Sequence, residues 1–452
     1  MKIPCRFARG IRAVGALLIC LASAWADDAP KLFYPINILA QPKITGDWGG
    51  MRDRAITNGV RITGQSVNDM LWNTTGGIST GSACAGLFQF GVTVDTAKTI
   101  GLEGGTFKNT WLWLYGRNPS SYVGDAYGVS GIAANPAFRA YELWYQQNLW
   151  NDAFSLRGGL LGLDAEFALS PTSALFVNGS FGFPNFLSQN LVNGGPEYPM
   201  ATPGLRLALK PLSWLTLRSA LTQANPFSQA QNLHNFNWNF GPSGGLLSIT
   251  EAEADWDSLL KDRHLPGAAK AGFWIQNGPS PTLPEDWAFG APGTLGYCSG
   301  CYGIIDQLLY RAPSALSGKN PVSCKGSSSA DDSAPVQGLS SYARIGFSPQ
   351  PASTLCLSVD GGLVYTGLIP GRTEDQLGAG FSYGQLGSGY SGLGISQGIQ
   401  DPFYSAVAEL TYSIQLAPAV KLQPDLQYVI RPNGSAQYGN ALVAGFRAIV
   451  DF

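Results

Sequence analysis

Apolar and polar residues alternate one by one along several short stretches of this chain. The C-terminal stretch is the clearest. Its even-numbered positions from Leu442 to Phe452 are all apolar, whereas the positions between them include Arg447 and Asp451. Successive side chains of a strand point to opposite faces, so this pattern predicts a strand with one apolar face and one more polar face.

Similar alternation predicts further strands at 88–95, 141–146, 205–210, 215–221, 405–415 and 422–430. In the second of these, we expect Tyr141, Leu143 and Tyr145 on the apolar face, opposite Glu142 and Trp144. Stretches rich in turn-forming residues interrupt the pattern and predict longer surface loops at 277–303, 317–338 and 384–401. The predicted fold class is therefore all-β.

The N-terminus has the organisation of a secretory signal peptide. Four cations from Lys2 to Arg12 precede an uncharged stretch at 13–24, and residues 24–26 read AWA, a cleavage site of the small-x-small type. The uncharged stretch is shorter than the ~20 residues that a membrane-spanning helix needs, which disfavours an uncleaved anchor. We expect cleavage after Ala26 and export of the remaining chain.

The exported part contains no run of eighteen apolar residues, so any insertion into a membrane is expected to use strands. The chain has 57 Gly, 12% aromatic and 13% charged residues, whereas soluble domains carry about a quarter charged residues. A soluble β-sandwich would show the same alternation. The export signal and the terminal aromatic strand favour a transmembrane antiparallel β-barrel, because in lipid only a closed sheet satisfies every strand hydrogen bond.

Charge and cysteine content exclude some classes of function. Loss of four of the 28 Lys and Arg residues leaves 24 against 30 Asp and Glu, which gives no indication of nucleic-acid binding. Five cysteines remain, so at least one is unpaired. We interpret Cys298 and Cys301 as part of a loop disulfide, made within this pair or to Cys324. No second Cys/His pair accompanies them, so we predict no metal site and no cofactor.

An enzyme is the next class to consider. Four serines have the Gly-x-Ser-x-Gly spacing of a hydrolase nucleophile elbow, namely Ser79, Ser243, Ser382 and Ser396. An elbow needs a strand, a sharp turn and a helix, and these serines lie in Gly-rich stretches instead. His234 and His264 both have turn-rich surroundings, and no H-E-x-x-H pattern occurs. We therefore predict no catalytic site.

Several short Gly-containing or aromatic motifs follow one another along the chain. Residues 45–52 read TGDWGGMR, 162–167 read GLDAEF, 176–182 read FVNGSFG, 367–372 read GLIPGR and 422–428 read LQPDLQY. In this order the chain resembles the carbohydrate-selective porins of the OprB type. The resemblance extends over nearly the whole exported chain, from about Ile44 to Phe452.

The resemblance implies a barrel of about 16 strands in the outer membrane of a Gram-negative bacterium, with short periplasmic turns, long external loops and a water-filled lumen. Residues 1–26 would be the signal peptide, 27–59 a short helical or extended lead segment, and 60–452 the barrel. The implied function is passive, substrate-selective diffusion of glucose and related carbohydrates. Its partners would be carbohydrates, outer-membrane lipid and the barrel-assembly machinery, which reads the terminal Phe452. The alternative is a general or ion-selective porin without a sugar site.

Charged side chains on the polar strand faces are the candidates for contact with sugar, because each sugar hydroxyl both donates and accepts hydrogen bonds. Glu142 and Arg157 are the first choice, and Trp144 could stack on a pyranose ring. The alternative is that opposed charges only pair and stiffen the wall. The pore-lining candidates are Asp95, Glu142, Trp144, Arg157, Arg206, Arg218, Arg344, Glu409, Asp425 and Arg447.

Overall fold

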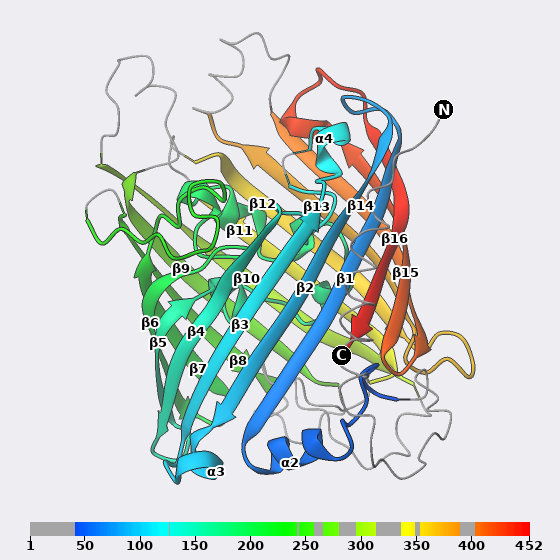
Figure 1. Cartoon of the computed structure of the whole chain (residues 1–452). Coiled ribbons are helices and arrows are strands. Elements are labelled where there is room, and N and C mark those ends of the chain that lie inside the picture. The colour runs from blue at the N-terminus through cyan, green and yellow to red at the C-terminus, as the bar shows by residue number, and fades with distance from the viewer. Residues whose placement is uncertain are drawn as a thin grey trace.

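The structure is a computed structural model that describes residues 41–452 apart from 126, 242–243, 257–264, 280–294, 313–335, 349–352 and 389–402. Its strands form one closed antiparallel barrel, in which each strand pairs with the next along the chain and β16 pairs with β1 (Figure 1). This confirms the predicted fold class. The strands are β1 (Val60–Thr75), β2 (Gly81–Asp95), β3 (Gly105–Gly116), β4 (Ala137–Leu149), β5 (Phe154–Leu161), β6 (Thr202–Leu212), β7 (Leu215–Gln223), β8 (Leu246–Asp255), β9 (Gly267–Pro279), β10 (Leu295–Arg311), β11 (Gly338–Phe347), β12 (Leu355–Thr366), β13 (Gln376–Leu386), β14 (Tyr404–Ala417), β15 (Val420–Ile430) and β16 (Ala441–Asp451).

The strands place apolar residues outside and charged residues inside. In β6, Leu205 and Leu207 are exposed on the outer surface, while Arg206 between them is buried on the lumen side. In β14, Leu410 is exposed and its neighbour Glu409 is buried. This is the period-two pattern expected of a sheet with an apolar outer surface and a polar interior. No helix within the described ranges is long and apolar enough to cross a membrane.

The C-terminal strand closes the barrel. Residues of β16 pair with β1 in a register that sets Arg447 opposite Asp69. The backbone N–H of Phe452 donates to the carbonyl oxygen of Gly64 at 2.8 Å, and its ring packs edge-on against Phe88. The terminal aromatic residue therefore belongs to the outer surface of the closed sheet.

Short helices mark the two ends of the barrel. α2 (Met51–Thr57) and α3 (Thr96–Ile100) lie at the end where β16 finishes, and α4 (Ser120–Val123) lies at the other end (Figure 1). Arg52 of α2 donates to the carbonyl oxygen of Phe452 at 3.3 Å. The predicted signal peptide and the start of the predicted lead segment fall in 1–40, outside the described residues.

Two predictions about connections were wrong. The resemblance implied short periplasmic turns. The short turns β4–β5, β6–β7 and β14–β15 lie at the end that carries α3, so this end corresponds to the periplasmic one, but strand direction places the long connection 312–337, between β10 and β11, at the same end. Its residues 313–335, with Cys324, lie outside the described part of the chain. The stretch 277–303 was predicted as a loop, yet β9 and β10 occupy both of its ends, because pairing on both sides compensates for the weak strand preference of its glycines.

The predicted disulfide between Cys298 and Cys301 was also wrong. Both residues lie in β10, where a separation of three positions puts them on opposite faces of the sheet. Cys298 is buried, Cys301 is exposed, and the two residues form no disulfide with each other. A pairing with Cys324 falls outside the described residues.

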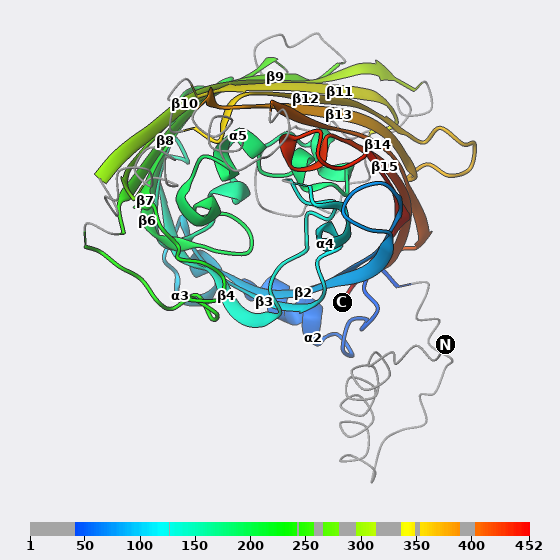
Figure 2. The same cartoon turned by 90° about the horizontal axis from the view of Figure 1, so that it is seen from above.

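The chain between β5 and β6 folds into the lumen. Residues 162–201, called here the inner segment, include α5 (Asn185–Ser188) and several short 3-10 turns (Figure 2). Phe186 and Leu187 pack against Trp274 and Tyr302 of the barrel wall in one apolar cluster.

The ring of Phe176 contacts a glycine-lined part of the wall. A Cβ atom added to Gly362 or Gly380 would come within 2.9 Å of a Phe176 ring carbon, closer than real Cβ contacts allow. These glycines therefore let the inner segment approach the sheet.

Candidate functional site

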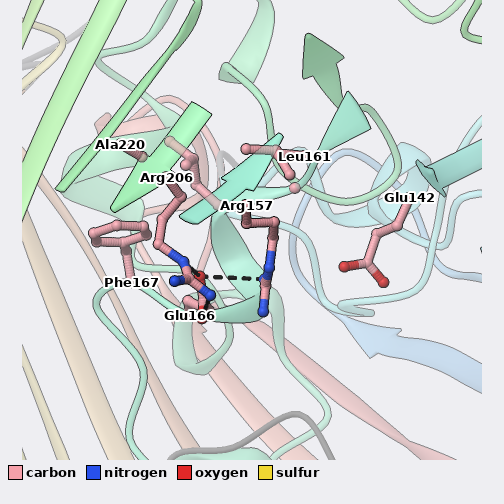
Figure 3. A pocket seen from close by; sticks show the side chains of 9 residues that line it. Glu142, Arg157, Leu161, Glu166, Phe167, Arg206 and Ala220 are labelled. Carbon is pink, nitrogen blue, oxygen red and sulfur yellow. Dashed lines mark hydrogen bonds and ion pairs between the residues drawn. The ribbon is translucent and has the colours of Figure 1, made fainter. Parts of the chain in front are cut away.

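The inner segment and the wall from β4 to β7 line a small hollow that is open to the lumen. Figure 3 shows Arg157 and Arg206 side by side against the carboxylate of Glu166, with Glu142 on the far side of Arg157. The lining residues are Glu142, Arg157, Leu161, Gly162, Leu163, Glu166, Phe167, Arg206 and Ala220.

Two arginines and one carboxylate form the centre of the hollow. Arg157 and Arg206 are direct neighbours across β5 and β6. Like charges in such positions repel. The Glu166 carboxylate lies between them, 3.2 Å from Nη1 of Arg157 and 2.7 Å from Nε of Arg206. The Gln146 side-chain oxygen accepts from both guanidinium groups. These contacts hold both guanidinium groups in fixed positions. The two arginines and Glu166 together carry one net positive charge.

Glu142 and Trp144 extend this group along β4. The indole N–H of Trp144 donates to Glu142 at 3.0 Å, and Nζ of Lys108 lies 2.7 Å from the same carboxylate. The guanidinium carbon of Arg157 lies 3.9 Å from the centroid of the Trp144 ring. Such a cation–π contact holds the guanidinium plane in place. Trp144 is only 4% exposed, so in this structure it supports Arg157 and does not present a free ring face to a sugar.

A β-bulge in β4 sets these positions. Thr110 of β3 pairs with Glu142, whereas the next residue, Trp111, pairs with Ala140, so Tyr141 is an extra residue in the ladder. Tyr141 is therefore buried rather than on the outer face, and its hydroxyl donates to Asp164 of the inner segment. The prediction that Tyr141 shares a face with Leu143 was wrong, because alternation fails at a bulge.

Other predicted residues hold the inner segment in place. Arg344 pairs with Asp360 at 2.9 Å and donates to three carbonyl oxygens of the inner segment. Glu409 accepts from the backbone N–H groups of Val177 and Asn178 at 2.6 and 2.9 Å. These two side chains therefore act as anchors of the inner segment.

Arg447 and Asp425 lie on the same side of the lumen. Arg447 makes two bonds of 2.7 and 2.8 Å to Asp69. Asp425 accepts from Gln427, whose amide group also bonds Asn178 of the inner segment.

Arg218 belongs to a separate ionic group on β7 to β9. Its Nη1 atom lies 2.5 Å from Glu253 and 3.3 Å from Glu251. Glu251 in turn accepts from the backbone N–H of Ala168 in the inner segment. This group therefore joins the wall to the inner segment as well.

Asp95 does not join any of these groups. It is the last residue of β2, and its side chain accepts from the backbone N–H of Ala97 at 3.0 Å as the N-cap of α3. Capping satisfies a free N–H at the start of a helix, which explains the carboxylate at this position.

Sequence reasoning missed Glu166, Lys108 and Gln146. Glu166 lies on the inner segment, where no strand alternation shows its direction. Its presence in the GLDAEF motif at 162–167 was the available signal. Within the described ranges, no group of three or more His, Cys, Asp or Glu residues is arranged to hold a metal ion.

The carboxyl group of Asp164, next to the hollow, changes its protonation state with pH. Burial raises the pKa of Asp164 to about 6; the hydrogen bond from Tyr141 opposes this rise and the charge of Glu142 adds to it. This carboxylate takes up a proton as the pH falls from 7 to 5, so the lumen loses a negative charge. We expect the reversal potential, measured in planar bilayers, to shift in the direction of anion selectivity over this range.

Asp164→Asn should flatten this pH dependence. Asp152→Asn is the matched control, because Asp152 is exposed in the turn between β4 and β5 and should leave the profile unchanged. An unaltered profile in Asp164→Asn would exclude Asp164 as the titrating group.

Comparisons with known proteins agree with this architecture. Residues 79–452 match the family described as carbohydrate-selective porin, OprB family. Porin B of Pseudomonas aeruginosa is 23% identical, over 98% of this chain and 96% of that protein. The high-pH structure of Pseudomonas putida OprB superimposes with a TM-score of 0.77 at 21% identity, over 91% of this chain and 99% of that one. The low-pH structure of that protein gives 0.56 at 17% identity, with the same coverage.

Proposed function

This chain belongs to the OprB family of carbohydrate-selective porins, and we propose that sugars cross its lumen past the wall formed by Arg157, Glu166 and Arg206. It is a porin of the Gram-negative outer membrane that lets carbohydrates diffuse passively through a β-barrel. The observation that carries the proposed site is the fixed pair of guanidinium groups around one carboxylate in the wall of the hollow.

This group of side chains matches the chemistry of a sugar. Guanidinium groups offer several N–H donors in a plane, while Glu142 and Glu166 offer acceptors, so adjacent sugar hydroxyls can exchange bound water for both kinds of partner. Conduction requires that the sugar leaves as readily as it enters. A dissociation constant near ~1 mM, equivalent to about 4 kcal/mol, suits such a site.

The two sides of the lumen have different roles in this proposal. Glu166, the least buried of the group, and Arg157 beside it contact the passing sugar, while Arg206 and Glu142 hold these side chains in place. Arg344 and Glu409 position the inner segment that narrows the lumen. The lumen charges are therefore not all equivalent, and only the first group should set affinity.

The remaining assignments are part of the same proposal. The chain is a channel and not an enzyme. Residues 1–26 serve as the export signal, 27–59 as the lead segment and 60–452 as the barrel. The exposed leucines of β6 and β7 contact membrane lipid, and Phe452 at the end of the closing strand is the residue read by the barrel-assembly machinery.

Bilayer recordings test the sugar site. We expect glucose and short glucose oligomers to reduce the ion current of the purified protein in a saturable way, with half-block in the millimolar range. An uncharged polyethylene glycol of similar size is the control for simple volume exclusion and should not saturate. Absence of block across the millimolar range would contradict a sugar site and favour a general diffusion porin.

A further inference from the structure

The connection between β7 and β8 does not stay at the barrel rim. Its residues 226–240, called here the outer flap, pass over the outside of the wall beside β4 (Figure 2). We propose that the outer flap lies within the hydrocarbon layer of the membrane, where it seals a notch in the barrel wall and contacts lipid acyl chains.

The notch arises because β5 is short. Its pairing with β4 begins at Leu143 and Leu160, and β5 ends at Leu161, where the chain turns into the lumen. The backbone of β4 before Leu143 therefore needs other hydrogen-bond partners on this side. The outer flap supplies them. The N–H of Ala140 donates to the carbonyl oxygen of His234 at 3.3 Å, and the Asn235 amide donates to the Ala140 carbonyl at 2.9 Å.

Ring contacts give the depth of the outer flap. The ring of Phe236 lies 6.1 Å from Trp111, which stacks on Phe138 at 5.2 Å. Trp111 lies near the middle of β3 and on its outer face, since the adjacent Leu112 is buried inside. The middle of a membrane-spanning strand lies within the apolar band. The outer flap therefore reaches the depth of the hydrocarbon layer.

The composition of the outer flap fits this depth. Residues 226–240 read PFSQAQNLHNFNWNF and contain no Asp, Glu, Lys or Arg. Leu233, Phe236, Trp238 and Phe240 are 41%, 53%, 38% and 78% exposed. Together with the exposed Trp113 and Phe138 they continue the apolar outer surface of the barrel. A connection in water would not gain from exposing these rings.

Asparagine side chains of the outer flap form hydrogen bonds with the backbone groups of the outer flap itself. The Asn232 amide donates to the carbonyl oxygens of Pro226 and Asn237, and its oxygen accepts from the Asn237 N–H. The indole N–H of Trp238 donates to the carbonyl of Asn235 at 3.1 Å. Non-strand backbone at membrane depth must find partners inside the protein. This internal bonding favours lipid over a second copy of the chain as the contacting partner, because a second copy would supply polar partners of its own.

Lipid photolabelling tests the inference on the unmodified protein. The full chain is reconstituted in vesicles whose phospholipids carry a diazirine on the acyl chain, irradiated, digested and mapped by mass spectrometry. We expect label on the outer flap at a level comparable with the leucines of β6, and little on the connection 431–440, which serves as the aqueous reference. Label on β6 but not on the outer flap would overturn the proposal. Cross-links between the outer flaps of two copies, with loss of lipid label, would overturn it in favour of a subunit interface.

A charged substitution gives a second test. Phe236→Lys should lower the lipid label on the outer flap, because Phe236 lies at the depth of Trp111 and a charge there draws the segment toward water. Gln437→Lys, in the connection 431–440, is the matched control and should leave the label on the outer flap unchanged. Equal labelling of the Phe236→Lys variant and the unmodified protein would contradict a hydrocarbon position for Phe236.

Discussion

Replacing Arg157 with alanine should weaken sugar block of the ion current about tenfold to a hundredfold. A hydrogen bond to a charged donor contributes about 1.5–3 kcal/mol, and Arg157 offers its donors in a fixed plane against Glu166 and the Trp144 ring. The measurement is a titration of single-channel current with glucose, which gives the dissociation constant before and after the change. Arg206→Ala should act in the same direction, because Arg206 shares the Glu166 carboxylate.

A conservative variant and a variant far from the site distinguish a loss of sugar affinity from a general loss of structure. Arg157→Lys keeps the charge but loses the planar fork and the stacking on Trp144, so it should recover only part of the affinity. Arg54→Ala removes an exposed arginine of α2, outside the lumen, and should not change the titration. If glucose blocks the Arg157→Ala variant with the same dissociation constant as the unmodified protein, Arg157 does not belong to the sugar site.

Replacing Arg344 with alanine should have a large effect of a different kind. Arg344 is almost fully buried, pairs with Asp360 and donates to the carbonyls of Ala168, Ser180 and Gly182. Removing one partner of a buried ion pair costs about 3–5 kcal/mol, because the other charge stays buried without compensation. We expect the thermal unfolding temperature, followed by the gel mobility of the folded barrel, to fall. We also expect the open-channel current to rise as the inner segment detaches from the wall.

A double variant distinguishes the two consequences. Arg344→Leu with Asp360→Asn removes the buried charges together, so much of the lost stability should return. The three carbonyls of the inner segment still lack their donor, so the larger current should persist. A double variant with the current of the unmodified protein would show that Arg344 does not position the inner segment.

Glu409 and Arg344 illustrate what strand alternation can and cannot show. The sequence predicted Glu409 on the polar face of the strand 405–415 and listed Arg344 as a pore-lining candidate, and the structure buries both side chains on the inner face of the barrel. Alternation did not show that Glu409 binds the backbone of Val177 and Asn178, since those residues belong to a segment without strand periodicity. The same limit applies to Glu166. Its position depends on how the inner segment folds back, which is decided by packing of Phe176 and Phe186 against the wall.

Tyr141 and Cys298 show two further limits. A bulge shifts the alternation by one residue, and nothing near Tyr141 in the sequence indicates where the extra residue lies. In β10, glycines and serines weaken the strand signal around Cys298, so the segment was interpreted as a loop. Pairing with both neighbouring strands overrides this local preference, because a barrel wall tolerates no missing strand.

The sequence by itself determined the fold class, the closing role of the last strand, and the inward direction of Arg157, Arg206 and Glu142. It could do so because alternation is a local property that a membrane makes obligatory. Only the tertiary structure decided which of the inward charges line the hollow and which hold the inner segment. That division depends on contacts between residues far apart in the chain, such as Arg344 with Ser180. A local sequence pattern does not show which of two inward-facing arginines will bind the backbone of the inner segment.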